Sequence, residues 1–178
     1  MTAPASAGLP APRATPYRIG FVCLGNICRS PMAEVVLTEL VDLAGLAAKV
    51  EVASCGTGDW HIGHPIDPRA ATALLAEGYD PSLHRAKQFD QGWLEQDLLL
   101  AMDAQNLHDV TDGRGESERV RLFRSFDPVL PDPADATQQV DRDVPDPYYG
   151  GEEGFAEVVA MVERTCRRLL QELEALEL

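Results

Sequence analysis

Lysine is almost missing from this sequence: its 178 residues include only Lys49 and Lys87, and 15 basic residues stand against 29 acidic ones, a formal net charge of -14. A protein that binds nucleic acid needs a stripe of basic side chains along the phosphate backbone, and this composition offers none. We therefore predict no nucleic-acid partner. Because salt screens exposed charges beyond about 8 Å, the acidity does not exclude an anion site, but such a site must be built locally.

Long hydrophobic runs are missing as well. No stretch reaches the ~18 consecutive apolar residues that span a bilayer. The first residues lack the basic start and the unbroken apolar core of a secretory signal. The sequence thus predicts no membrane partner and a cytoplasmic protein.

Cysteines are few, and their spacing is unlike that of a metal site or of a secreted disulfide scaffold. No Cys-x-x-Cys pair occurs among the four, which are Cys23, Cys28, Cys55 and Cys166. His61 and His64 lie close together in the sequence, but two histidines without further ligands are more often ordinary loop residues. We predict neither a metal nor any other cofactor.

The chain has enough apolar residues for one hydrophobic core, with 45% hydrophobic content. Residues 1–16 contain four prolines among Ala, Ser and Gly, a mixture that orders poorly. We expect a disordered N-terminal tail over residues 1–16 and a single domain over residues 17–178.

Strand and helix patterns alternate along this domain. We expect strands at 18–24, 50–54, 98–102 and 120–123, with helices at 31–43, 67–78 and 105–110 and a long last helix through 155–173. Ser30 is expected to cap the first helix, and residues 127–147 to form an irregular surface loop. The alternation predicts an α/β fold with three layers, in which helices cover both faces of a four-stranded parallel sheet. Ligands of such sheets bind at the carboxyl ends of the strands.

The most informative segment follows the first expected strand and reads Cys-Leu-Gly-Asn-Ile-Cys-Arg-Ser-Pro, residues 23–31. A short loop that enters a helix aims backbone N–H groups at one point, where the helix dipole adds about half a positive charge. Arg29, separated from Cys23 by five residues, can add two parallel hydrogen bonds to a phosphoryl group. The same positive field favours the thiolate of Cys23. The pattern predicts a phosphate loop with a cysteine nucleophile.

Gly25 and Asn26 support this interpretation, because both tolerate the left-handed backbone conformation that a tight anion-binding turn requires. A nucleotide-binding P-loop would need a lysine before its Ser or Thr, and none occurs here. The alternative is structural, with Cys23 as a small buried side chain and Arg29 as a surface cation. The strand, the turn and the Ser-Pro helix start together favour the phosphate loop.

At this point the chain resembles the low-molecular-weight protein-tyrosine phosphatases. The family signature has the form Cys-x-Gly-Asn-x-Cys-Arg-Ser-Pro-Met-Ala-Glu and matches residues 23–34 throughout. Further matches follow in the family's order at 54–60, 67–69, 84–86, 102–103 and 146–149, so that the resemblance covers residues 17 to about 175. It implies hydrolysis of phosphotyrosine in proteins, and of small aryl phosphates in vitro, through a phosphocysteine intermediate.

The resemblance also implies a general acid, because a tyrosine leaving group needs a proton at neutral pH. Five Asp-Pro dipeptides occur in the chain. The resemblance assigns the acid role to Asp146, which precedes Pro147, two tyrosines and two glycines. A bound phosphate dianion favours the protonated form of a neighbouring carboxyl. Asp127 stays open as the alternative acid.

The remaining site residues are grouped by the role that the resemblance implies. Phosphate-binding residues are Leu24, Gly25, Asn26, Ile27, Cys28 and Arg29; pocket walls are Trp60, Tyr148 and Tyr149; residues that support the loop by hydrogen bonds are Asn26, Ser30, Ser54 and His84. Two alternatives stay open. The aromatic residues can be ordinary loop side chains, and His84, which precedes Arg85, can be an exposed histidine.

The other cysteines receive separate expectations. Cys28 lies in the same loop as Cys23 and can capture an oxidised nucleophile as a reversible disulfide. Cys55 stands where similar sequences usually have alanine, so a second disulfide partner near the site stays open. Cys166 lies on the apolar face of the last expected helix and is assigned to the core.

Three other functions compete on this scaffold. Thioredoxin-linked arsenate reductases need two further cysteines downstream, and this chain has none between Cys55 and Cys166. Protein-arginine phosphatases tend to have Thr in place of Ile27, so Ile27 favours phosphotyrosine. A phosphoprotein-binding module without catalysis would not need Cys23, Arg29 and Asp146 together, yet all three are present.

Overall fold

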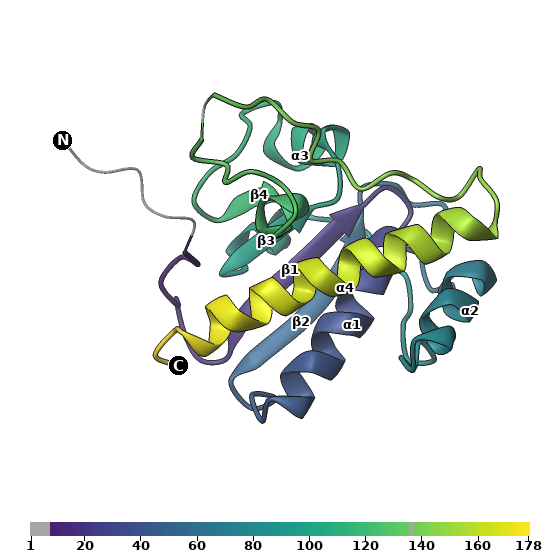
Figure 1. Cartoon of the computed structure of the whole chain (residues 1–178), viewed down its shortest axis with the longest axis horizontal. Coiled ribbons are helices and arrows are strands. Elements are labelled where there is room, and N and C mark those ends of the chain that lie inside the picture. Colours follow the sequence, from purple (N-terminus) through teal and green to yellow (C-terminus); the bar gives the residue numbers. More distant parts are fainter. Residues whose placement is uncertain (1–7, 136) are drawn as a thin grey trace.

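The computed structural model describes residues 8–135 and 137–178 (Figure 1). Its centre is one sheet of four parallel strands in the order β2-β1-β3-β4. The strands are β1 (Tyr17–Cys23), β2 (Val50–Gly56), β3 (Leu98–Ala101) and β4 (Val120–Leu122). β1 is paired along both edges, and its side chains are nearly all buried because apolar side chains pack on both faces of the sheet. The predicted parallel sheet is confirmed.

Helices cover both faces of the sheet. They are α1 (Arg29–Leu43), α2 (Pro68–Ala76), α3 (Ala104–Thr111) and α4 (Glu152–Glu174), with two short 3₁₀ turns, η1 (Gln91–Glu95) and η2 (Phe123–Phe126). α1 and α4 lie side by side on one face, and α3 lies on the other (Figure 1). The predicted three-layer α/β/α fold is therefore confirmed. None of these helices combines the length and the apolarity that a bilayer span requires.

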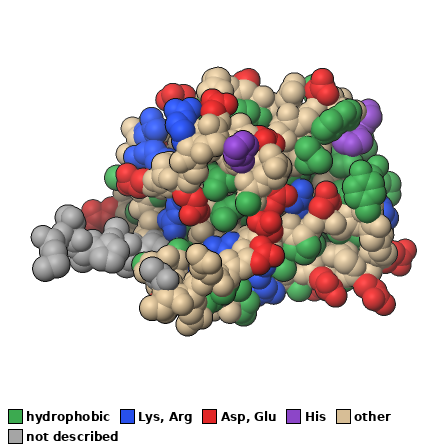
Figure 2. Space-filling view, turned by 90° about the horizontal axis from the view of Figure 1, so that it is seen from above, with side chains coloured by type: hydrophobic (Ala, Val, Ile, Leu, Met, Phe, Trp, Pro, Cys, Tyr) green, Lys and Arg blue, Asp and Glu red, His purple; other side chains and the backbone are tan. Residues whose placement is uncertain are grey.

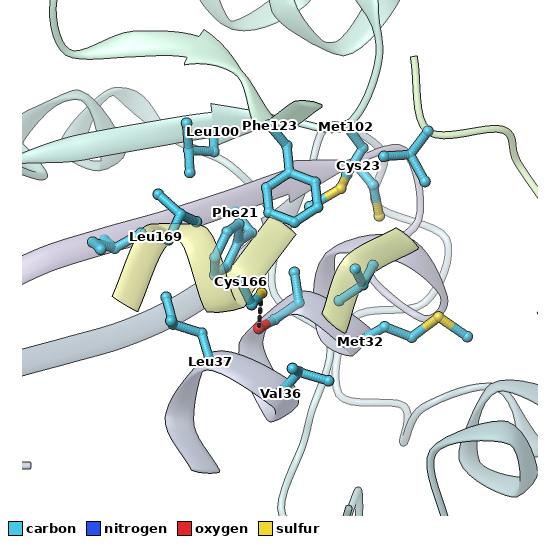
Figure 3. Packing of buried hydrophobic residues seen from close by; sticks show 14 of the residues in the cluster. Phe21, Cys23, Met32, Val36, Leu37, Leu100, Met102, Phe123, Cys166 and Leu169 are labelled. Carbon is cyan, nitrogen blue, oxygen red and sulfur yellow. Dashed lines mark hydrogen bonds between the residues drawn. The ribbon is translucent and has the colours of Figure 1, made fainter. Parts of the chain in front are cut away.

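The larger part of the core lies between the sheet and the pair formed by α1 and α4. Figure 3 shows Phe21 of β1 and Phe123 of η2 packed edge to face, with ring centroids 5.5 Å apart. Cys166 of α4 is fully buried beside α1, which confirms its assignment to the core. Burying one large apolar side chain stabilises a fold by about 1.5–3 kcal/mol. The central strand, and with it the position of Cys23, is thus fixed by packing.

α1 begins differently from the prediction. Its first residue is Arg29, its N-cap is Cys28, and no side chain caps it. Ser30 is the second residue of the helix, and its hydroxyl lies 2.9 Å from the sulfur of Cys23. The prediction that Ser30 caps the helix was wrong, because this hydroxyl has partners in the site instead. Asp67, by contrast, caps α2 by accepting from the Arg69 amide at 2.8 Å.

The segment predicted to be a disordered tail is described from residue 8 onward. Residues 8–16 differ from that expectation, since Pro10 is buried and its carbonyl oxygen accepts a hydrogen bond from the Tyr17 hydroxyl at 3.0 Å. The amide of Arg13 donates to Asp97 at 2.6 Å. These contacts hold residues 10–13 against the domain. Residues 1–7 lie outside the described residues, and their disorder stays a prediction.

Candidate active site

The phosphate loop leaves β1 at Cys23 and enters α1 at Arg29, so it lies at the carboxyl end of the central strand. Asn26 has a φ of 54°, in the left-handed region where Asn is enriched among non-glycine residues. The expected left-handed turn residue is therefore Asn26, and Gly25 lies outside that region.

Strand β2 approaches this loop very closely at Gly56. A Cβ atom built on Gly56 would lie 2.7 Å from the Leu24 carbonyl oxygen and 2.9 Å from the Asn26 nitrogen. Any side chain would therefore push the loop away from the strand. Sequence reasoning gave Gly56 no role of its own and only included it in the segment 54–60 that resembles the family. The structure shows that its lack of a side chain allows the shape of the loop.

The sulfur of Cys23 lies at the bottom of the loop, with a residue exposure of 2%. It accepts a hydrogen bond from the Asn26 amide at 3.3 Å and lies 2.9 Å from the Ser30 hydroxyl. The loop thus places a backbone amide and a hydroxyl against the sulfur, both of which can donate hydrogen bonds.

Buried side chains hold Asn26 in its left-handed conformation. Its side-chain nitrogen donates to the Ser30 and Ser54 hydroxyls, at 2.9 Å each. Its side-chain oxygen accepts from the Lys87 amide at 2.8 Å. Asn26 and both serines are fully buried. Since each lost partner would leave a buried polar group unsatisfied, these bonds specify one conformation of the loop.

His84 belongs to the same network, because only 6% of it is exposed. Its Nε2 donates to the Asn26 carbonyl oxygen at 2.7 Å, and its Nδ1 lies 3.2 Å from the Glu34 carboxylate. Glu34 also accepts from the Ser54 hydroxyl. The exposed alternative for His84 was wrong. Sequence reasoning missed Glu34, although it is the last residue of the family signature.

Arg29 is held by residues from two other segments. Its Nη1 donates to the Asp103 carboxylate at 2.6 Å and to the Val144 carbonyl oxygen at 3.0 Å. Burial by itself lowers the pKa of Arg29, but the charge on Cys23 and the bond to Asp103 outweigh it, so the pKa is raised. The guanidinium therefore stays charged next to the sulfur. Sequence reasoning missed the role of Asp103.

Asp146 comes to the same place from the segment before α4. Its Oδ2 lies 3.6 Å from Nη2 of Arg29, and its Oδ1 accepts from the Tyr148 amide at 3.1 Å. About a third of its side chain is exposed. The carboxyl group is therefore open both to the pocket and to solvent.

These parts surround one pocket with a volume of about 370 Å³. Its lining consists of Cys23, Leu24, Gly25, Ile27, Cys28, Arg29, Trp60, His61, Asp146, Tyr148 and Tyr149. The pocket brings together the three expected catalytic residues and the three expected aromatic residues. Trp60 and Tyr149 are exposed by 64% and 90%, so they stand at its mouth rather than in the core.

A strongly apolar wall and a charged floor at the end of parallel strands are what a phosphate monoester with an aromatic group requires. A family model described as low molecular weight phosphotyrosine protein phosphatase matches residues 18–177. The chain belongs to this family. The match begins one residue after the start of β1 and ends beyond α4, so it includes every element that forms the site.

Similar proteins from other organisms agree with this membership. The chain is 46% identical over 158 residues to a low molecular weight protein-tyrosine-phosphatase of Streptomyces coelicolor, covering 86% of this chain and 92% of the relative. It is 45% identical over 148 residues to low molecular weight protein-tyrosine phosphatase A of Mycobacterium tuberculosis, covering 83% and 86%.

The fold of the family is shown by solved structures. A protein tyrosine phosphatase from Entamoeba histolytica, crystallised with Hepes in the active site, is 31% identical to this chain. Its TM-score is 0.77, and the alignment covers 89% of this chain and 97% of that one.

His61 also lines the pocket of this phosphatase. Sequence reasoning had assigned it no role in the site. Its ring lies against the phosphate loop, because a Cβ built on Gly25 would be 3.1 Å from the ring carbon Cδ2. Gly25 thus leaves room for His61. No group of three or more metal-binding side chains occurs in residues 8–135 and 137–178, so His61 and His64 have no third ligand there.

Asp127, the alternative general acid, does not line the pocket of this phosphatase. It is 3% exposed and accepts from Arg164 at 2.8 and 2.9 Å and from Arg124 at 3.0 Å. Burial raises its pKa, but the bonds from Arg164 and Arg124 dominate and lower it. Asp127 is therefore a buried, ionised partner of two arginines and has no place for a substrate proton.

None of the four cysteines of this phosphatase forms a disulfide, and all four are buried. Burial and nearby carboxylates raise the pKa of Cys28, and burial raises those of Cys55 and Cys166. Cys55 packs with Val22 and Leu99 on the face of the sheet opposite to the core that contains Cys23. The structure thus places the Cys55 side chain away from the pocket, and Cys28 remains the cysteine that shares it with Cys23.

Proposed function

We propose that this chain hydrolyses phosphotyrosine in proteins, with Cys23 as the nucleophile and a phosphocysteine as the intermediate. The observation that carries the proposal is the convergence of the Cys23 sulfur, the Arg29 guanidinium and the Asp146 carboxyl on one pocket. Nη1 of Arg29 is bound to Asp103 and Val144. Its Nε and Nη2, with the amides of residues 24–29, are therefore the donors we assign to the phosphoryl oxygens.

The reaction then has two displacements. The Cys23 thiolate attacks phosphorus, the bond to the tyrosine oxygen breaks, and Asp146 gives its proton to that oxygen. Asp146, now a carboxylate, takes a proton from water, which attacks the phosphocysteine. Phosphate leaves, and the electron pair of the S–P bond returns to the sulfur. Ser30 supports this last step, because its hydroxyl lies 2.9 Å from that sulfur and can donate to it.

The shape of the pocket supports an aryl ester as the substrate. Trp60 on one side and Tyr148 with Tyr149 on the other form walls at which a phenyl ring can stack. The tyrosines also contact one another edge to face, with centroids 4.9 Å apart. Figure 2 shows carboxylates spread over the face seen from above, while exposed hydrophobic side chains gather near a histidine at its right-hand end. Aryl recognition supports phosphotyrosine proteins as substrates in the proposal, with small aryl phosphates as their counterparts in vitro.

A panel of phosphopeptides tests the proposal. We expect kcat/KM for a phosphotyrosine peptide to exceed that for the matched phosphoserine and phosphoarginine peptides by at least about 100-fold, because only the first has a ring for the aromatic walls. Release of inorganic phosphate is the measurement. Preference for phosphoarginine would assign the chain to the other substrate class, and binding of phosphotyrosine without release of phosphate would make it a binding module.

We further propose that Cys28 protects the nucleophile against peroxide. Peroxide oxidises the Cys23 thiolate to a sulfenic acid, and the Cys28 thiol then attacks this sulfur, so that a disulfide forms and water leaves. Both cysteines line the same pocket. The raised pKa of Cys28 keeps its thiol protonated at neutral pH. Cys28 therefore does not compete with Cys23 for the substrate.

The expected result concerns recovery after oxidation. Wild-type enzyme inactivated by peroxide should regain most of its activity with a dithiol, whereas Cys28→Ser should lose a larger share permanently, because its sulfenic acid oxidises further. Activity before oxidation, after oxidation and after dithiol treatment is the measurement. Equal recovery of both proteins would remove the protective role from Cys28.

We also propose that the protein works in the cytoplasm. All four cysteines are free thiols, and reducing compartments maintain this state. The proposed reaction itself requires a reduced Cys23.

A further inference from the structure

Arg69 connects the two loops that meet in the pocket. It lies two residues after Asp67. The Asp67 amide donates to the carbonyl oxygen of Ile27 in the phosphate loop at 2.8 Å. Arg69 donates to both carboxylate oxygens of Asp67, at 3.1 and 2.9 Å. Its Nη1 donates to the Tyr148 carbonyl oxygen at 2.9 Å. A continuous chain of hydrogen bonds thus runs from the phosphate loop to the segment that contains Asp146.

The guanidinium of Arg69 also lies against two aromatic rings. Its central carbon is 5.3 Å from the centre of the Tyr148 ring and 4.7 Å from that of Phe155. Phe155 is in the first turn of α4 and is 1% exposed. A guanidinium stacked on aromatic rings is held in its plane. Arg69 therefore fixes Tyr148 both through its backbone and through its ring.

The position of Asp146 depends on Tyr148. Among the described residues, the only partners of the Asp146 carboxylate are the Tyr148 amide at 3.1 Å and Nη2 of Arg29 at 3.6 Å. The segment from Asp146 to Gly151 has no helix or strand of its own to hold it. A shift of Tyr148 would consequently move the carboxyl group relative to the sulfur.

We propose that Arg69 is a positioning residue, which holds the Asp146 carboxyl group at the distance from the phosphate loop that proton transfer to the leaving group requires. The inference rests on the proposed function and assigns it one more residue. A guanidinium is needed for this role, because the planar group binds a carboxylate and a carbonyl oxygen at once and stacks on a ring. Lysine keeps the charge but not this geometry.

The test is the loss of kcat/KM for two esters measured on the same sample of Arg69→Gln. Phenyl phosphate releases a weakly acidic phenol and needs the proton, whereas p-nitrophenyl phosphate releases a far more acidic phenol and needs it little. A displacement of about 1 Å in an active site can cost about 100-fold. We expect a loss of about 10- to 100-fold for phenyl phosphate and of at most about 3-fold for p-nitrophenyl phosphate. The ratio of the two losses does not depend on how much of the sample is folded.

Three comparisons complete the test. Arg69→Lys should show most of the same ratio, and Arg114→Gln, which removes an exposed arginine paired with Asp112, should show none of it. In an Asp146→Asn background, Arg69→Gln should add no further change of the ratio, since both act on the same proton transfer. Equal losses on both esters, or no loss, would overturn the positioning role while leaving the hydrolysis in place. Wild-type enzyme that hydrolyses neither ester would overturn both.

Discussion

Cys23→Ser should remove essentially all turnover, with kcat/KM for p-nitrophenyl phosphate lower by about 10⁴-fold or more, as for other enzymes that lose their nucleophile. A serine hydroxyl is a far weaker nucleophile than the thiolate that the proposed reaction requires. The Asn26 amide and the Ser30 hydroxyl, which contact the sulfur at 3.3 and 2.9 Å, remain to hold the new side chain. The variant should therefore keep its fold and its binding site.

Two measurements separate this loss from a loss of structure. Titration calorimetry should show that Cys23→Ser still binds a phosphotyrosine peptide, because Arg29 and the loop amides are unchanged. The control is Cys166→Ala, which removes another buried thiol from the core beside α1 and should retain most activity. If Cys23→Ser kept more than about a hundredth of the wild-type rate, another nucleophile would have to be sought.

The phosphate loop could be predicted from the sequence because its parts are neighbours in the chain. Cys23 and Arg29 are separated by five residues, and the turn and the helix start between and after them are local features. Asp103 and Gly56 reach the loop from distant segments, and Glu34 lies in α1 but finds its partners Ser54 and His84 far along the chain. Only the folded sheet brings them together, and each is one of many residues of its type in an acidic chain.

Asp103 nevertheless had a usable signal. It lies two residues after the end of the buried strand β3, which is the parallel neighbour of β1. The carboxyl ends of neighbouring parallel strands lie at the same edge of a sheet, so a charged residue after β3 is expected near the phosphate loop. For Ser30 the family resemblance indicated a hydrogen bond in the site, whereas the local Ser-Pro pattern alone predicted a helix cap.

The N-terminal segment shows the limit of composition. Its prolines and small residues predict disorder, yet Arg13 donates to Asp97 and Arg119 donates to the Ala11 carbonyl oxygen at 3.0 Å. The groups that hold residues 10–13 come from distant parts of the domain. A composition rule evaluates a segment alone and cannot include such partners.

Asp146→Asn should lower kcat/KM for phenyl phosphate by about 100- to 1,000-fold, within the range that a general acid contributes. Asparagine keeps the acceptor oxygen that the Tyr148 amide uses at 3.1 Å, so the turn should survive. The matched control is Asp132→Asn. Asp132 also precedes a proline and accepts from the amide two residues on, at 2.8 Å, but it lies outside the pocket. The Asp132→Asn variant should hydrolyse phenyl phosphate with the same kcat/KM as the wild-type enzyme.

The two steps of the reaction give Asp146→Asn a kinetic signature that a structural defect would not produce. With p-nitrophenyl phosphate the first step needs little proton transfer, so nitrophenol should appear in a rapid burst equal to the enzyme concentration. Hydrolysis of the phosphocysteine still needs a base, and the steady rate after the burst should fall with kcat. A uniform loss of burst and steady rate on both esters would mean that Asp146 binds the substrate or supports Arg29. A burst followed by slow turnover assigns the base role to Asp146, and together with the larger loss on phenyl phosphate it assigns both roles to the same carboxyl group.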